Sequence, residues 1–125
     1  MKKATLKTFS LVLAAAVWWA AESTAAPFIE GFEDIPIPQG MTQTESDNIS
    51  FGNEETRLVE AYLTGSKTQF KDVEAFYMNT LPQLGWTFQG KQGNSISFYR
   101  DGEKLDIVRE QKSPLLVRIT IKSQN

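Results

Sequence analysis

Acidic side chains are the residues of this sequence whose types and spacing could most readily do chemistry. Glu30, Glu33 and Asp34 lie within a stretch of five residues, and clustered carboxylate oxygens can bind a hard cation such as Ca²⁺. The surrounding segment lacks the glycine turn and the alternating acids of a calcium-binding loop. We interpret the three acids as a solvated acidic run, and we predict neither a metal site nor a cofactor.

A second carboxylate chemistry would need two acids in one cleft. Glu54, Glu55 and Glu110 could supply the pair that hydrolyses a glycosidic bond, but the sequence does not bring them together. The chain has no histidine and no cysteine, so it lacks the usual general base, the usual proton shuttle and the commonest transition-metal ligand. We therefore predict that the protein is not an enzyme, and a carboxylate-only hydrolase is the least favoured alternative.

Basic residues form no catalytic motif. A serine or threonine nucleophile needs an activating base, and here only lysine or a carboxylate could serve. Residues 90–94, GKQGN, have glycines and a lysine that could suit a phosphate, but a hairpin turn explains them without a ligand. The lysines fall in predicted turns or at positions that we expect to be exposed: Lys67, Lys71, Lys91, Lys104, Lys112 and Lys122.

The first residues have the pattern of a secretory signal peptide. A positive end with three lysines precedes an uncharged apolar run at residues 9–21. This run is shorter than the roughly 20 residues of a membrane-spanning helix. Small residues at Ser23 and Ala25 suit a signal peptidase, so we expect residues 1–25 to be removed and the mature protein to be periplasmic.

The charge of the mature chain limits its partners. Removing residues 1–25 takes three lysines and one glutamate from the 13 basic and 15 acidic residues, which leaves a net charge of −4. Nucleic acids and anionic membranes are bound mainly through basic patches, so we expect neither as a partner. Without cysteine the chain cannot carry the lipid-modified cysteine of a bacterial lipoprotein, so we predict no lipid anchor.

The mature chain divides into an arm and one domain. Residues 26–40 contain Pro36 and Pro38, which favour an extended conformation. We describe this segment as an extended proline-containing arm, and residues 41–125 as a single domain with one modest core.

The arm carries more apolar side chains than a solvated linker needs. We expect Ile35 and Ile37, next to the prolines, to pack on the domain. Phe28, Ile29 and Phe32 are expected to stay mobile and to form the candidate interaction surface, because a core this small has little room for all five.

Hydrophobic periodicity predicts a strand before a helix. Residues 56–64 alternate, with Val59, Ala61 and Leu63 on one face, as a half-buried strand requires. Ile49 and Phe51 are the candidates for an earlier short strand. An amphipathic stripe with spacings of three and four then predicts a helix that faces a core: Phe70, Val73, Phe76, Tyr77, Leu81 and Leu84.

The ends of this helix are marked by capping and breaking residues. Thr68 is the expected N-cap, with Ser66 followed by Gln69 as an alternative capping box. Pro82 interrupts the backbone hydrogen bonds, and Gly85 suits the left-handed position that closes a last turn. Trp86 then starts a period-two pattern, so we interpret it as a core residue rather than as an exposed binding aromatic.

The last third of the sequence predicts a four-strand meander. Asp101-Gly102 is a strong hairpin signal, and residues 90–94 and 112–114 mark the other turns. We expect Arg100, Lys104, Arg118 and Lys122 on the uncovered face of the sheet. The inward residues are Ile96, Phe98, Leu105, Ile107, Leu115, Val117, Ile119 and Ile121. The predicted fold is α+β: an antiparallel sheet of one or two strands, a helix and then the four-strand meander, with the single helix packed on one face.

Three pieces of the sequence, DIPIPQGM, FYMNTLPQLGW and ISFYRDGEKLDI, resemble uncharacterised bacterial envelope proteins with a domain of unknown function. In that group an Ile-Pro-x-Pro-x-Gly opening precedes a helix with Phe-Tyr that ends in Met-Pro-x-x-Gly-Trp, and Leu81 stands here where methionine is common. The resemblance covers roughly residues 34–121 and implies a shared fold without an established activity. Many similar proteins are lipoproteins, from which this cysteine-free chain departs.

These observations predict a non-catalytic periplasmic interaction or accessory module that docks on an unknown envelope protein. The alternative is a small carrier for a lipid or another small apolar ligand, which would need a sizeable closed cavity between the sheet and the helix.

We predict that the mature protein begins at Ala26, because cleavage one residue later would place Pro27 directly after the cut bond. Intact-mass measurement of the protein released from the periplasm without detergent tests the cleavage site. Recovery of a species that retains residues 1–25, or recovery from membranes alone, would contradict it.

Overall fold

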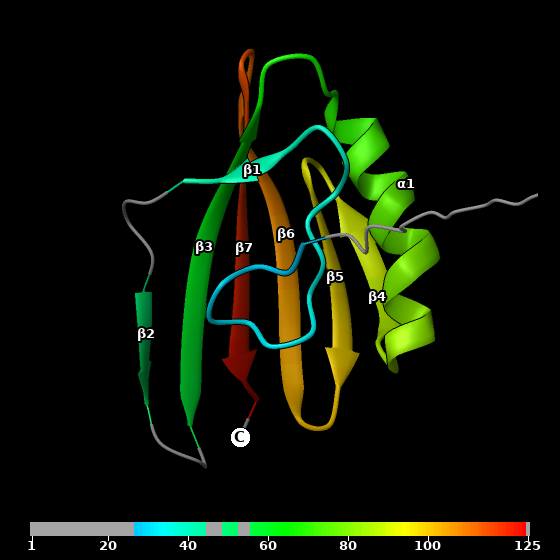
Figure 1. Cartoon of the computed structure of the whole chain (residues 1–125). Helices are drawn as coiled ribbons and strands as arrows, with labels where there is room; N and C mark the ends of the chain where they lie inside the picture. The colour runs from blue at the N-terminus through cyan, green and yellow to red at the C-terminus, as the bar shows by residue number, and fades with distance from the viewer. Residues whose placement is uncertain (1–26, 45–48, 53–55, 125) are drawn as a thin grey trace, which may run out of the picture.

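The computed structural model describes residues 27–44, 49–52 and 56–124. The predicted signal peptide, its cleavage site, and Glu54 and Glu55 lie outside these residues. Within them, one antiparallel sheet and a single helix form the α+β fold that the sequence predicts (Figure 1).

The described strands form a seven-stranded sheet in the order β1-β3-β7-β6-β5-β4, with β2 also paired to β3. Because β1 and β2 pair with the same edge of β3, the sheet is six positions wide (Figure 1). The strands are β1 (Thr42–Gln43), β2 (Ile49–Gly52), β3 (Arg57–Gly65), β4 (Thr87–Gln92), β5 (Ser95–Arg100), β6 (Glu103–Lys112) and β7 (Leu115–Ser123). The predicted strand before the helix and the four-strand meander are confirmed, and the short β1 was not predicted.

The last strand lies in the middle of the sheet. β7 inserts between β3 and β6, so Ile119 is opposite Ala61 on one side and Ile107 on the other. The inward residues predicted for the meander are all buried. The Asp101-Gly102 turn is also confirmed, since both residues have positive φ, 48° and 80°, as a two-residue hairpin of this kind requires.

Helix α1 spans Phe70–Thr80, and the 3₁₀ turn η1 continues it over Leu81–Leu84. Its N-cap is Gln69 and not Thr68, because the Asp72 carboxylate accepts a hydrogen bond from the Gln69 N–H at 3.3 Å and closes a capping box there. Gly85 takes the left-handed conformation with φ 93°. The helix stop expected at Pro82 and Gly85 is therefore confirmed.

One helix is too narrow to cover this sheet. Neighbouring strands lie about 4.8 Å apart, so six positions span about 24 Å, whereas a helix with its side chains is about 10 Å across. Figure 1 shows α1 beside β4 and β5, with the N-terminal segment 27–41 looping over the middle of the same face. The covering layer thus has two parts, one helical and one extended.

Hydrogen bonds fold the N-terminal segment back on itself. The Ile29 N–H donates to the Ile35 carbonyl at 2.8 Å, and the Ile37 N–H donates to the Pro27 carbonyl at 2.7 Å. The buried Tyr77 hydroxyl donates to the Pro36 carbonyl at 2.6 Å and so joins the segment to α1. Burial raises the pKa of Tyr77 far above its ordinary value.

The expectation that Ile29 and Phe32 stay free for a partner is wrong. Their exposed fractions are 1% and 2%, and both belong to the hydrophobic core together with Ile35 and Ile37. Only Phe28 of the candidate interaction surface is exposed, at 54%. The segment supplies side chains that the helix cannot supply, so it is part of the fold and not a separate arm.

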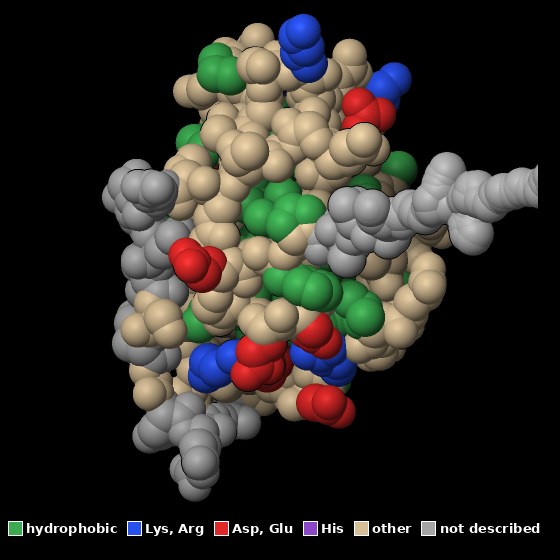
Figure 2. Space-filling view, viewed as in Figure 1, with side chains coloured by type: hydrophobic (Ala, Val, Ile, Leu, Met, Phe, Trp, Pro, Cys, Tyr) green, Lys and Arg blue, Asp and Glu red, His purple; other side chains and the backbone are tan. Residues whose placement is uncertain are grey.

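Two ion pairs close the lower end of the covered face in Figure 2, where acidic and basic side chains gather. Arg57 binds Glu103 through two hydrogen bonds of 2.8 and 2.9 Å, which raise the pKa of Arg57. Arg100 contacts Asp34 at 2.9 Å and lies 4.3 Å from the ring centre of Trp86.

The prediction that Arg100 faces outward is wrong, because it shares the parity of Ile96 and Phe98, which both point to the covered face. Trp86 is confirmed as a core residue with an exposed fraction of 2%. Its indole N–H has no acceptor among the described residues, so the ring is held by packing and by the Arg100 guanidinium.

No helix in the described ranges is both long and apolar enough to cross a membrane.

We predict that Phe32→Ala lowers the free energy of unfolding by about 3 to 5 kcal/mol, as deletion of a large buried aromatic does. Phe28→Ala is the matched control, because the same truncation at this exposed position should change stability by about 0.5 kcal/mol or less. Urea unfolding of the two variants measures both values. Small and equal effects would show that the segment does not belong to the core.

Candidate functional site

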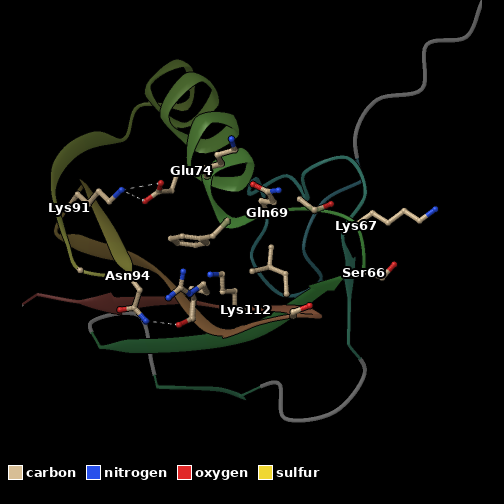
Figure 3. A pocket seen from close by; sticks show the side chains of 14 residues that line it. Ser66, Lys67, Gln69, Glu74, Lys91, Asn94 and Lys112 are labelled. Atoms are coloured by element: carbon tan, nitrogen blue, oxygen red, sulfur yellow. Dashed lines mark hydrogen bonds and ion pairs between the residues drawn. The ribbon is translucent and has the colours of Figure 1, made fainter.

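A cavity of about 970 Å³ opens where α1 begins, at the end of the covered face opposite the two ion pairs. It is bounded by the first turns of the helix, the β4–β5 turn and the β6–β7 turn (Figure 3). Its lining is rich in basic side chains: Lys67, Lys71, Lys91, Arg109 and Lys112. Glu74 is the one carboxylate among the lining residues. We call this the basic cavity.

Two β-bulges direct lysines into the basic cavity. In β4 the register shifts between Phe88 and Gly90, so Lys91 comes opposite the buried Ile96. In β6 it shifts between Arg109 and Gln111, so Lys112 comes opposite the buried Leu115. Residues directly opposite in an antiparallel pair share a face. Each bulge therefore moves a lysine to the helix-covered face.

Arg109 reaches the same end of the sheet by simple alternation. It follows Leu105 and Ile107, which are both buried on the covered face, and it pairs with the buried Val117. Asn94 fixes this part of the backbone, because its side-chain amide donates to the Arg109 carbonyl at 2.7 Å and its own carbonyl accepts from the Arg109 N–H at 2.9 Å.

Glu74 holds one of the lysines. Lys91 Nζ donates to Glu74 Oε1 at 3.2 Å and lies 3.1 Å from Oε2, which it contacts as an ion pair without a directed hydrogen bond. Figure 3 shows these two side chains pointing toward each other, while Ser66 and Lys67 lie at the other end of the cavity and extend away from it. Lys67 is thus a rim residue.

Elsewhere on the described part of the protein, most basic side chains are paired with acids. Arg57, Arg100 and Arg118 each contact a carboxylate at 2.9 Å or less. Lys104 lies 3.8 Å from Asp106. In the basic cavity, by contrast, Lys91 alone has a described carboxylate within 4 Å. The unpaired positive charge of the described residues is therefore concentrated there.

The structure does not bring the predicted acidic residues together as a site. Asp34 binds Arg100, Glu110 binds Arg118 at 2.6 Å, and the Glu30 backbone contacts Gln43. No group of three or more acids within ranges 27–44, 49–52 and 56–124 is arranged to hold a metal.

Sequence reasoning missed the basic cavity, although one of its residues could have been found. Period-two alternation does place Arg109 on the covered face, and that signal could have been used. The bulges could not be read in the same way, because strict alternation from Trp86 and Phe88 sends Lys91 to the opposite face. The expectation that Lys104 and Lys122 lie on the uncovered face is confirmed by their register opposite each other in β6 and β7, out of phase with the buried residues.

Comparisons with protein-family models, curated proteins and solved structures found no match to this chain. The resemblance to uncharacterised envelope proteins therefore stays a prediction, and the function has to be argued from the geometry of the site.

We predict that Lys112→Gln leaves the free energy of unfolding unchanged or raises it by about 0.5 kcal/mol or less, because it removes one of several mutually repelling charges. The effect should be larger in 0.01 M salt than in 0.1 M salt, where the screening length falls from about 30 Å to about 10 Å. Urea unfolding at both salt concentrations measures it.

Arg57→Gln is the contrast: it breaks the paired hydrogen bonds to Glu103 and should destabilise the fold by about 1 to 2 kcal/mol. A comparable loss for Lys112→Gln would assign Lys112 a structural role.

Proposed function

We propose that the protein is a non-catalytic, exported binding module of the bacterial envelope, and that it holds an anionic group of its partner or ligand in the basic cavity. The observation that carries this proposal is that two bulges place Lys91 and Lys112 on the covered face, where they line the same cavity as Arg109. Bulges next to functional sites commonly redirect a side chain in this way. A lysine on β4 can be explained as protection of a sheet edge, because β4 is an edge strand. β6 is an interior strand, so edge protection does not explain Lys112.

The charge distribution supports selective binding. The sequence carries a net negative charge, so an anion is not attracted to the protein surface in general. A concave site lined by one sign of charge focuses the field and raises the local concentration of counter-ions. The basic cavity can therefore attract an acidic group to this end of the protein.

The two alternatives expected from the sequence have less support. A lipid or apolar-ligand carrier needs an apolar cavity between helix and sheet, whereas the basic cavity opens at the end of that layer and most of its lining residues are charged or polar. A carboxylate-only hydrolase needs two acids in one cleft, and Glu74 is the single carboxylate among the described residues that line this cavity.

The proposal moves the interaction surface away from the N-terminal segment. Ile29 and Phe32 are buried in the core, so they are not available to a partner. Phe28 is exposed, but one aromatic side chain is a small surface, and isolated exposed apolar residues are ordinary on folded proteins.

We predict that the exported protein binds at least one of three multivalent anions, namely pyrophosphate, citrate or a hexaglutamate peptide, and that Arg109→Gln and Lys112→Gln each weaken this binding about tenfold. Backbone amide shifts of Lys91, Asn94 and Lys112 during a titration measure binding and its place. The anion should be recovered chemically unchanged.

Lys122→Gln is the matched control for this experiment. It removes the same charge from an exposed position on the uncovered face, and the Lys122 ammonium itself has no described carboxylate within 4 Å. The substitution should therefore leave the affinity unchanged. If no anion shifts these amides, or if Lys122→Gln weakens binding as much as Lys112→Gln, the basic cavity is not a binding site.

A further inference from the structure

We propose that the group recognised in the basic cavity is a phosphate monoester dianion, either free or part of a larger ligand. This inference rests on the proposed function of the cavity and names the chemistry of its ligand. It is carried by three features of the site: the kind of cation present, the role of Glu74, and the number of positive charges left without a carboxylate.

Lysine dominates the cavity. Four of its five basic lining residues are lysines, counting Lys67 at the rim (Figure 3), and one is arginine. Arginine binds both carboxylates and phosphates through a rigid fork with two parallel hydrogen bonds, whereas lysine acts as a compact point charge that responds mainly to the charge of the ligand. A set of point charges favours the ligand with the most charge at one centre. A phosphate monoester carries about −1.5 to −2 at neutral pH, and a carboxylate carries −1.

A single carboxylate neutralises only part of the positive charge of this site. Glu74 pairs with Lys91 at 3.1 to 3.2 Å, and Lys71, Arg109 and Lys112 still have no described carboxylate within 4 Å. A second monoanion would again leave positive charge uncompensated. A dianionic centre with several acceptor oxygens can contact more than one of the remaining cations at once.

Glu74 should also compete with such a ligand. Its Oε2 is buried and its carboxylate pairs with Lys91, so an incoming phosphate meets a negative charge and one lysine that is already engaged. Glu74→Gln keeps the shape of the side chain and removes that charge. This substitution should therefore strengthen phosphate binding, the opposite of its expected effect if Glu74 only stabilised the cavity.

The pH dependence of binding should report the charge of the ligand and not that of the protein. It has no histidine, so no side chain has an ordinary pKa between about 5 and 8. The second pKa of a phosphate monoester is about 6. If the dianion is the bound form, the apparent affinity should rise about tenfold between pH 5 and pH 7, because the dianion fraction rises from about one tenth to about nine tenths.

The test is a titration of the exported protein with glycerol 3-phosphate, sulfate, citrate and a hexaglutamate peptide, followed by amide shifts at pH 5 and pH 7. We expect glycerol 3-phosphate to bind more tightly than either carboxylate ligand at pH 7 and to weaken about tenfold at pH 5. Sulfate keeps its charge over this range and should bind equally at both pH values. Glu74→Gln should tighten glycerol 3-phosphate binding about threefold or more, because it removes the competing negative charge. A threefold change corresponds to about 0.7 kcal/mol.

The outcomes separate this inference from the proposed function. Tighter binding of citrate or hexaglutamate, or glycerol 3-phosphate binding that does not change with pH, overturns the phosphate assignment and leaves an anion-binding module. Absence of binding by all four ligands and by pyrophosphate overturns both. Phosphatidylcholine vesicles with and without phosphatidic acid identify the source: retention on the phosphatidic acid vesicles, reduced in Lys112→Gln and not in Lys122→Gln, assigns a lipid headgroup, and binding of soluble phosphate alone assigns a free ligand.

Discussion

The mismatch between one narrow helix and a wide sheet determines most of this structure. A single helix covers only part of a sheet that is six positions wide, and the apolar side chains of β3 and β7 would be left in water without a further cover. The N-terminal segment supplies that cover with Ile29, Phe32, Ile35 and Ile37. It is irregular, so its backbone groups need partners, which explains its internal hydrogen bonds and the contact between Tyr77 and Pro36.

The same constraint acts along the strands and produces the basic cavity. Helix α1 has 11 residues and rises about 16 Å, and the four residues of η1 add about 8 Å, whereas the ten residues of β6 extend about 33 Å. The covering layer is therefore shorter than the sheet. At one end the arginine–carboxylate pairs of Arg57 and Arg100 close the gap. At the other end the gap stays open and is lined by cations that the described acids do not neutralise, apart from Glu74 beside Lys91.

The elements of the fold could be predicted from the sequence because their signals are local. The stripe through Phe70, Val73 and Tyr77, the turn at Asp101-Gly102 and the alternation in β5 to β7 each depend on neighbouring residues. The position of the N-terminal segment depends instead on how much of the sheet the helix leaves bare, a three-dimensional quantity. Phe32 is buried and Phe28 is exposed although both are phenylalanines in the same segment. The site was less predictable still, because a bulge changes the facing of Lys91 and Lys112 without a distinct residue pattern.

The distribution of charge is the strongest physical reason to regard the basic cavity as functional. A fold under selection for stability alone gains from placing acids near its cations, and this protein does so for Arg57, Arg100 and Arg118. The chain has more acidic than basic residues, so a shortage of acids does not explain the cations that lack a described carboxylate near α1. Uncompensated like charges repel one another and oppose the compact state. Such an arrangement is expected where a ligand completes the neutralisation, because binding then releases the repulsion that the free protein retains.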